Sequence, residues 1–323
     1  MKNNTILVLG EPDVQQASML ETLPPEASVF VGNSATAFGQ AVADADILFN
    51  WSGSPALFRE VFRLCPRLRW VHSRSAGLDK SLFPELIESS VVLTNGSGVF
   101  SSSLGEFALA AILYFAKDFR RMIRNQMAGV WEAFDVLPIA GYTVGIVGYG
   151  DMGRAVAARV RAMGMKVLAV KRHVSPEGQA DALVDEVFGP DRRIEMLARC
   201  DYVVVTAPLT AETNGMIGEA EFATMKPTAV VINVGRGPVI NERALVKAVA
   251  EGRIKGAALD VFDEEPLPEG HPFYRRENVL LSPHCADHTP EWLNDAMRFF
   301  IAQYERFRRA EPLLNVVDKK LGY

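Results

Sequence analysis

An apolar strand runs directly into a Gly-x-Gly-x-x-Gly pattern near the middle of this chain. The stretch from 144 to 153 reads VGIVGYGDMG and carries Gly148, Gly150 and Gly153. In a strand–turn–helix unit, the first glycine permits the tight turn, the second lets phosphates approach the backbone, and the third lets the helix pack on the strand. The N–H groups of the first helical turn, here Asp151 and Met152, then face an anion. The pattern predicts a dinucleotide site.

The sequence around the glycines supports this interpretation. A buried strand is expected at 142–147, a helix at 152–163 that ends at Gly164, and a second strand at 166–170. Together they form a βαβ unit. A strand–turn–helix unit without any ligand is the alternative, because three glycines at this spacing also occur in purely structural turns.

The whole chain alternates short strands with helices on both sides of a break at 95–98, which reads NGSG. Strands are expected before the break at 6–9, 28–31, 47–50, 68–72 and 91–94, and after it at 143–147, 167–170, 202–206, 229–233, 257–260 and 279–282. Helices are expected at 102–127 and 291–309. This order predicts an α/β protein with two Rossmann-like, doubly wound parallel sheets and a cleft between them. We expect one domain at 1–98 plus 288–323 and the other at 99–287.

Composition excludes several classes of protein. The 323 residues are 49% hydrophobic and 23% charged, as in ordinary globular proteins, and the net charge of −5 offers no basic surface for nucleic acid or anionic membrane. No apolar run reaches membrane-spanning length. The three cysteines, Cys65, Cys200 and Cys285, lack disulfide or metal-ligand spacing, which favours a reducing, cytoplasmic location.

Polar side chains follow the later strands of the second domain. Arg236, Glu265 and His284 each lie just beyond the end of a different strand. In a parallel sheet these ends meet at one edge. A cation for a carboxylate, an acid for a carbonyl oxygen and a group to tune that acid are what reduction of a 2-oxo acid requires. Each residue also has a structural interpretation, and Glu264 is an adjacent alternative to Glu265.

Several motifs occur together in one order. They are the glycine fingerprint, Asn-Val-Gly-Arg-Gly at 233–237, Leu-Asp-Val-Phe at 259–262 with Glu-Pro at 265–266, Ser-Pro-His at 282–284, and VHSRSAGLD at 71–79. In these motifs the chain resembles the D-isomer-specific 2-hydroxyacid dehydrogenase family over essentially its whole length, most closely its glyoxylate and hydroxypyruvate reductases. The resemblance implies a dinucleotide-binding domain at 99–287 and a flavodoxin-like substrate domain at 1–98 plus 288–323.

The resemblance also implies roles for single residues. Arg236 would bind the substrate carboxylate, His284 would donate the proton, and Glu265 would hold the imidazole and favour its charged form. Beyond the fingerprint, the residues expected at the cofactor are Ala207, Pro208, Thr213, Val234, Gly235, Arg236, Asp260 and His284.

A second group of substrate-binding residues is expected in the first domain. The turn of Ser75, Ala76 and Gly77 offers backbone N–H groups to a carboxylate, and together with Arg236 and His284 it would hold the substrate. Trp51 follows a strand and either walls the same pocket or belongs to the core or the surface.

The cofactor preference depends on the end of the strand after the fingerprint. NAD-preferring sites carry an acidic residue there, whereas this chain has Lys171 and Arg172, which suit the extra phosphate of NADP. The sequence therefore favours NADPH over NADH, unless both side chains point into solvent.

No metal site is expected. His284 and His288 have the spacing of two ligands on one helix turn, but Pro283 and Pro290 bracket them and make a helix doubtful. Cys285 is expected to be a small packed residue, and the other three histidines, His72, His173 and His271, to be structural or exposed.

These observations predict an NADPH-dependent reductase that converts small 2-oxo acids such as glyoxylate or hydroxypyruvate to D-2-hydroxy acids. A dinucleotide-sensing binding protein of the same fold, similar to certain corepressors, is the alternative, and turnover distinguishes the two. The helix expected at 102–127 is more apolar than one buried face requires, which indicates a homodimer.

Overall fold

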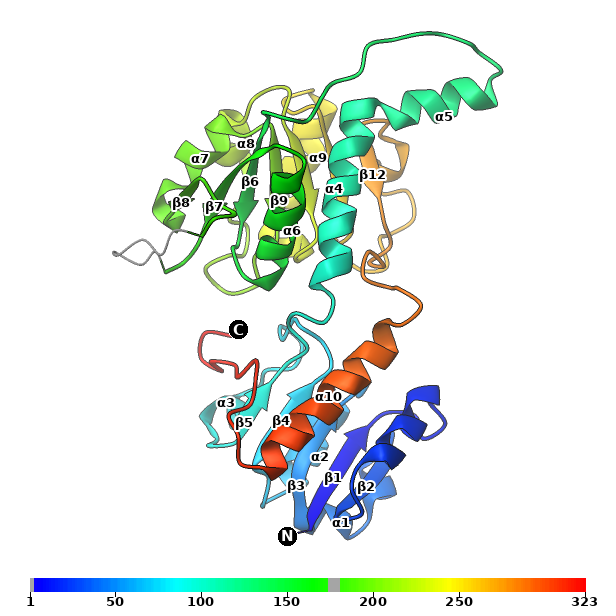
Figure 1. The fold of residues 1–323 in the computed structure, drawn as a ribbon, viewed down its shortest axis with the longest axis vertical. Helices are drawn as coiled ribbons and strands as arrows, with labels where there is room; N and C mark the ends of the chain where they lie inside the picture. Colours follow the sequence, from blue (N-terminus) through cyan, green and yellow to red (C-terminus); the bar gives the residue numbers. More distant parts are fainter. Residues whose placement is uncertain (1–2, 174–180) are drawn as a thin grey trace. The chain divides into compact units, whose positions relative to one another are not determined.

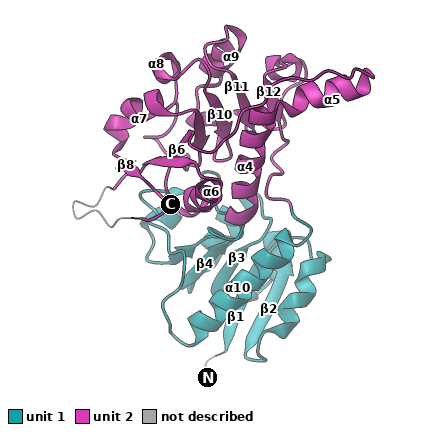
Figure 2. Cartoon of the chain, turned by 45° about the horizontal axis from the view of Figure 1, so that its top comes forward, with its two compact units in different colours: residues 1–100, 289–323 teal, residues 101–288 magenta. Residues whose placement is uncertain are grey.

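The computed structural model describes residues 3–173 and 181–323 of the chain. The chain divides into two compact units, shown in Figure 2: unit 1 is Met1–Phe100 with Thr289–Tyr323, and unit 2 is Ser101–His288. The expected junctions, after residues 98 and 287, lie two residues and one residue from these divisions. Within the described part of the chain, no helix has both the length and the apolar character needed to cross a bilayer.

Unit 1 is a five-stranded parallel sheet in the order β2-β1-β3-β4-β5 (Figure 1). Its strands are β1 (Asn4–Leu9), β2 (Ala27–Gly32), β3 (Ala45–Asn50), β4 (Trp70–Ser73) and β5 (Val92–Thr94). β3 is an almost continuous apolar run because both of its faces are covered, as parallel sheets require. The helical segments are η1 (Gln15–Thr22), η2 (Ala35–Phe38), α1 (Ala41–Asp44), α2 (Pro55–Leu64), α3 (Pro84–Glu88) and α10 (Trp292–Arg308).

The last helix, α10, completes the core of unit 1. The Phe300 ring stacks on Phe49 with centroids 4.0 Å apart and on Trp70 at 5.4 Å. Beyond α10, the Val317 N–H donates to the Leu93 carbonyl at 2.9 Å, so the tail lies along β5. The chain therefore returns to its first domain after the second sheet.

Unit 2 is a seven-stranded parallel sheet in the order β12-β11-β10-β9-β6-β7-β8. Its strands are β6 (Thr143–Val147), β7 (Lys166–Val170), β8 (Glu186–Phe188), β9 (Tyr202–Val205), β10 (Val230–Asn233), β11 (Gly256–Leu259) and β12 (Val279–Leu281). The two parallel sheets confirm the predicted fold class. The expectation of six strands was wrong, because it missed β8, a three-residue edge strand that pairs with β7 and has a single fully buried residue, Phe188. The strand order reverses at β6, and ligands bind beyond the carboxyl ends of strands at such a point.

The helices of unit 2 cover both faces of the sheet, and their bounds are α4 (Ser101–Lys117), α5 (Phe119–Met127), α6 (Asp151–Ala162), η3 (Pro190–Arg192), α7 (Arg193–Arg199), α8 (Glu219–Thr224), η4 (Gly237–Val239), α9 (Glu242–Ala250) and η5 (Pro272–Arg275). The helix expected at 102–127 is broken into α4 and α5. Asp118 adopts a left-handed conformation with φ of 51°, and its carboxylate accepts the Arg121 N–H at 3.4 Å, which caps a new helix. Figure 1 shows α5 pointing away from the sheet of unit 2.

The apolar surface of α4 is used inside unit 2. Leu104, Ala108, Ala111, Ile112 and Phe115 are all buried. A Cβ on Gly105 would lie 3.0 Å from the Ala155 backbone of α6, so the two helices are in close contact. The excess apolar character of this helix therefore reflects packing within the unit and does not by itself indicate an interface.

Candidate active site

The three glycines of the turn between β6 and α6 have two different roles: two allow close packing, and one leaves open space. Gly148 has φ of +97°, and a Cβ there would lie 2.5 Å from the Ala207 Cα, while a Cβ on Gly153 would lie 2.6 Å from the Gly148 carbonyl oxygen. Nothing in the protein lies within 4 Å of a Cβ on Gly150. The fold therefore requires two of the glycines, and the third leaves open space where Asp151 and Met152 begin α6. This geometry suits a pyrophosphate at a helix N-terminus.

The loops after β9 and β10 adjoin this turn. The Thr206 hydroxyl donates to the Gly148 carbonyl at 2.5 Å. A Cβ on Gly235 would lie 2.9 Å from the Ala207 carbonyl oxygen, so these segments lie backbone to backbone. The Val234 N–H donates to the Val205 carbonyl at 3.1 Å.

The Thr213 side chain is used within its own loop. Its hydroxyl donates to the Pro208 carbonyl at 2.6 Å and accepts the Thr210 N–H at 2.8 Å. Thr213 thereby shapes the segment that carries Ala207 and Pro208, both expected at the cofactor.

Lys171 and Arg172 directly follow β7 and are exposed. Arg172 forms an ion pair with Glu212 at 2.9 Å, and Glu212 belongs to the loop after β9. No acidic residue follows β7 directly, but Glu212 brings a carboxylate to this place from the loop after β9. The sequence did not predict this ion pair.

The His284 imidazole contacts the Glu265 carboxylate. His284 Nδ1 lies 2.8 Å from Glu265 Oε2, and Glu265 Oε1 accepts the Phe262 N–H at 3.0 Å. An ionised carboxylate only accepts hydrogen bonds, so Nδ1 carries the hydrogen and Nε2 is the atom left for chemistry. Glu265 is therefore the partner of His284, as expected from the choice between Glu264 and Glu265.

A buried carboxylate shapes the His284 segment. Oδ1 of Asp260 accepts the Ser282 hydroxyl at 2.5 Å, the Cys285 N–H at 3.0 Å and the Ala286 N–H at 3.1 Å. His284 itself has φ of +51°, a conformation that costs energy for a residue with a side chain and is common at functional sites. Asp260, expected at the cofactor, thus holds the backbone on both sides of this strained histidine.

The Arg236 segment is held by the strand that precedes it. The Asn233 side chain donates to the Arg236 carbonyl at 3.0 Å and accepts the Gly235 N–H at 3.1 Å. A Cβ on Gly237 would lie 2.0 Å from the Phe262 carbonyl carbon. Since β10, β11 and β12 are parallel neighbours, the segments that carry Arg236, Glu265 and His284 extend from the same edge of the sheet.

Two further features near His284 are the spacing of His284 and His288 and the position of Cys285, and only Cys285 differs from expectation. No helix connects His284 to His288, and the described residues contain no group of three or more His, Cys, Asp or Glu side chains able to hold a metal ion. Cys285 is exposed, so its expected role as a packed residue was wrong. It directly follows His284, in the segment between β12 and α10.

The turn of Ser75, Ala76 and Gly77 lies after β4 in unit 1. Two backbone contacts shape it, because the Asn95 amide donates to the Ala76 carbonyl at 2.7 Å and the Gly96 N–H donates to the Ser75 carbonyl at 3.3 Å. The placement of this turn at a carboxyl strand end agrees with a ligand site, and its role in binding stays a prediction.

Trp51 lies inside unit 1. Its side chain is 3% exposed, and it meets Phe49 edge-on at 5.6 Å. The Arg74 guanidinium lies over the Trp51 ring at 4.9 Å and over Trp292 at 5.3 Å. The structure favours the core alternative for Trp51, with Arg74 as the half-buried residue beside the Ser75 turn.

Two histidines outside the predicted site have clear surroundings. His72 is fully buried, its Nδ1 lies 2.8 Å from the Thr94 hydroxyl, and burial lowers its pKa to about 3. His271 was expected to be structural or exposed, and it is part-buried, with its Nε2 3.2 Å from Glu242 Oε1. The two residues are 29 positions apart, and no local pattern joins them.

Comparison with known proteins agrees with this geometry. Residues 109–286 match the family model of the D-isomer specific 2-hydroxyacid dehydrogenase NAD binding domain. A glyoxylate reductase of Korarchaeum cryptofilum is 33% identical over 294 residues, which cover 87% of this chain and 85% of that protein.

Solved structures of similar proteins cover nearly the whole chain. One is a D-isomer specific 2-hydroxyacid dehydrogenase from Xanthobacter autotrophicus in complex with NADPH, with a TM-score of 0.84, 28% identity, and coverage of 99% of this chain and 100% of that chain. Another is an NADPH-dependent glyoxylate/hydroxypyruvate reductase from Sinorhizobium meliloti in complex with NADP, with a TM-score of 0.84, 25% identity and the same coverage. The chain therefore belongs to the D-isomer specific 2-hydroxyacid dehydrogenase family.

Proposed function

We propose that this protein is an NADPH-dependent reductase of small 2-oxo acids, such as glyoxylate and hydroxypyruvate, that forms D-2-hydroxy acids. The observation that carries the proposal is the contact of 2.8 Å between His284 Nδ1 and Glu265 Oε2, beside the strand end that carries Arg236. A charged imidazole and a guanidinium at one sheet edge are the groups that a 2-oxo acid needs.

The chain's own residues divide the work of the reaction. The Arg236 guanidinium binds the substrate carboxylate and fixes the carbonyl beside the imidazole. Glu265 accepts from Nδ1, so the proton on Nε2 of the charged His284 passes to the carbonyl oxygen. The cofactor, when bound, supplies the hydride that C2 of the substrate accepts. The products are a 2-hydroxy acid and a neutral imidazole, which solvent protonates again.

The cofactor preference in this proposal depends on Lys171 and Arg172. The open side of Gly150 and the start of α6 would hold the pyrophosphate, and the two cations after β7 would pair with the 2′-phosphate of NADPH. Arg172 already binds one anionic group, the Glu212 carboxylate at 2.9 Å, which a phosphate would replace. The NADPH and NADP named in the two solved relatives support this preference.

A homodimer is part of the proposal, with its surface on α5, which is the last part of the helix expected at 102–127, and on the segment that follows. Apolar side chains are exposed on α5 and on the segment that follows it, with Ile123 54%, Met127 86% and Val130 50% exposed and Trp131 fully exposed. An exposed apolar patch of this kind marks an interaction surface. Sedimentation that shows only monomer at micromolar concentration would contradict the dimer.

A reducing, cytoplasmic environment is also part of the proposal, because the cysteines are free thiols. Cys65, Cys200 and Cys285 are all free. Burial raises the pKa values of Cys65 and Cys200 to about 12, so both are held as protonated thiols.

The test is the loss of NADPH and NADH absorbance with glyoxylate, hydroxypyruvate, pyruvate and phenylpyruvate. We expect turnover with NADPH and the small substrates. The double variant Lys171→Ala, Arg172→Ala should raise the Kd of NADPH by about 10-fold or more and leave that of NADH within about twofold, since a charge-assisted bond contributes roughly 1.5–3 kcal/mol. Tight NADPH binding without turnover of any substrate would instead favour the dinucleotide sensor.

A further inference from the structure

Two consecutive backbone N–H groups hold the loop that carries Glu265. The Phe262 N–H donates to Glu265 Oε1 at 3.0 Å, and the Asp263 N–H donates to Glu242 Oε2 at 3.2 Å. The first bond lies within the loop, and the second ties the loop to α9. The conformation that directs Glu265 toward His284 thus depends on a carboxylate that touches neither residue of the pair.

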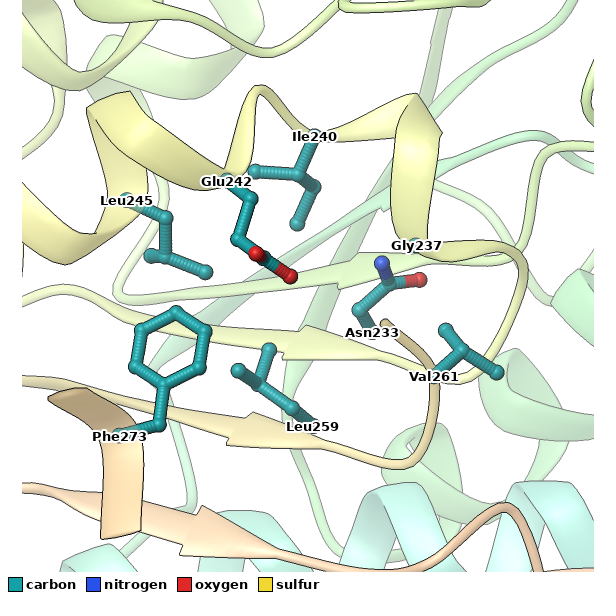
Figure 3. A pocket seen from close by; sticks show the side chains of 8 residues that line it. All are labelled: Asn233, Gly237, Ile240, Glu242, Leu245, Leu259, Val261 and Phe273. Carbon is teal, nitrogen blue, oxygen red and sulfur yellow. The ribbon is translucent and has the colours of Figure 1, made fainter. Parts of the chain in front are cut away.

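Glu242 also connects this loop to the Arg236 segment. It is the first residue of α9, whose N-cap Asn241 accepts the Ala244 N–H at 3.0 Å. The short turn η4, Ile240 and the N-cap Asn241 separate Glu242 from Arg236 along the chain. Figure 3 shows the Glu242 carboxylate directed into a small pocket that Asn233 also lines. A shift of Glu242 would therefore move the 262–265 loop relative to Arg236, which precedes the loop, and relative to His284, which follows it.

His271 contacts the other carboxylate oxygen of Glu242. Its Nδ1 accepts the Phe273 N–H at 3.3 Å, and its Nε2 lies 3.2 Å from Glu242 Oε1. Because Nδ1 is an acceptor, the hydrogen of the neutral ring lies on Nε2 and is donated to the carboxylate. The ring packs against Phe273 with centroids 4.8 Å apart. This imidazole is built to donate one fixed hydrogen bond.

We propose that Glu242 and His271 are positioning residues for the reaction, acting through the 262–265 loop on the Glu265–His284 contact. The expected effects on turnover rest on the proposed function. His271 orients Glu242, Glu242 fixes the Asp263 N–H, and the fixed loop presents the Glu265 carboxylate to Nδ1 of His284. Misplacement of a catalytic group by about 1 Å can cost about 100-fold in rate.

Matched variants separate the hydrogen bond from the bulk of the ring. His271→Phe keeps a ring but loses the donor to Glu242, whereas His271→Gln retains an N–H near the position of Nε2. We expect His271→Phe and Glu242→Gln to lower kcat by about 10-fold to 100-fold with the KM for NADPH within about twofold. His271→Gln should keep kcat within about threefold of wild type.

A double-mutant cycle distinguishes positioning from a general loss of structure. If His271 acts through Glu265, His271→Phe should cost less than about threefold in the Glu265→Gln background. Full additivity of the two losses would overturn the inference, as would wild-type kcat in both His271→Phe and Glu242→Gln.

A second readout does not depend on turnover. With 15N-labelled histidine, the His284 Nδ1–H resonance is assigned by its loss in His284→Gln. We expect this resonance to be kept in His271→Gln and shifted or lost in His271→Phe. An unchanged resonance in His271→Phe would overturn the inference even if the wild type reduced no substrate, while absent wild-type turnover would contradict only the proposed function.

Discussion

Two histidine–glutamate pairs of unit 2 combine the same two kinds of side chain and are arranged for different purposes. In the first pair, His284 and Glu265 have side chains 43% and 30% exposed and meet through Nδ1. In the second pair, His271 and Glu242 are 15% and 22% exposed and meet through Nε2. The ring nitrogen that is engaged decides what the other nitrogen can do.

The difference teaches how the backbone selects a function for a histidine. In His271, the Phe273 N–H occupies Nδ1, so both nitrogens are committed and the ring acts as a fixed donor. In His284, no backbone N–H of the described residues donates to the ring, and Nε2 stays available for a proton. A strained backbone at His284, with φ of +51°, belongs to the pair that we propose takes part in the reaction.

The largest effect should follow from removing the proton donor. Replacing His284 with Gln should lower kcat/KM for glyoxylate or hydroxypyruvate by about 10²-fold to 10⁴-fold, because a positioned general acid contributes about that much. Steady-state kinetics with NADPH measure the loss, and an NADPH titration verifies that the cofactor still binds. Unchanged turnover would break the distinction between the two pairs.

A smaller loss is expected when the partner of His284 is changed. Glu265→Gln removes the charge that favours the imidazolium, and kcat should fall by about 10-fold to 100-fold. Glu264→Gln is the matched control, because this neighbour has the same chemistry and the contact to His284 comes from Glu265. Equal losses in the two variants would show that Glu265 has no special role.

A third change forces apart the segments that carry Arg236 and Glu265. In Gly237→Ala the new Cβ would lie 2.0 Å from the Phe262 carbonyl carbon, so the loop must move. We expect a loss of about 10-fold in kcat and about 1–3 kcal/mol of stability. Gly218→Ala serves as the control, since its Cβ would meet nothing closer than 3.7 Å. Wild-type activity in Gly237→Ala would mean that the loop position is unimportant.

The smallest effect concerns His72, a buried histidine whose Nδ1 contacts the Thr94 hydroxyl. Burial lowers its pKa in the folded protein to about 3, against about 6.5 in the unfolded chain, so between these values the unfolded state binds more protons. This contribution to stability is present above pH 6.5 and is lost as the pH falls, by about 2 kcal/mol at pH 5.

The measurement for His72 is urea unfolding at pH 7 and at pH 5, followed by tryptophan fluorescence. Trp51, Trp70 and Trp292, three of the four tryptophans, lie in unit 1, so the signal reports on that unit. His72→Asn should be less stable than wild type at pH 7 and lose less stability on acidification. Identical losses in the two proteins would contradict a neutral, buried His72.

The sequence predicted dense local patterns well. The unit of β6, α6 and β7 lies within two residues of its expected bounds, because apolar runs, glycines and a helix stop all occur close together. The break at Asp118 was missed, since a left-handed aspartate leaves no periodic signal inside an apolar helix. The motif carrying Glu265 and His284 identified a pair that the fold then brought into contact.

Long-range partners were beyond sequence reasoning. Arg172 meets Glu212, 40 residues away, and His271 meets Glu242, 29 residues away. Each contact depends on which strands are neighbours in the sheet, and a single sequence does not report strand order. The alternatives for Trp51 stayed open for a related reason, because the aromatic cluster around it includes residues of α10 from the far end of the chain.

The most direct test of the central claim is a single-turnover experiment on enzyme loaded with NADPH and mixed with hydroxypyruvate, run side by side on wild type and His284→Gln. We predict that both proteins bind NADPH at the saturating concentration used, and that the variant oxidises it at least about 100-fold more slowly. Equal rates of NADPH oxidation in the two proteins would contradict the assignment of His284 as the proton donor.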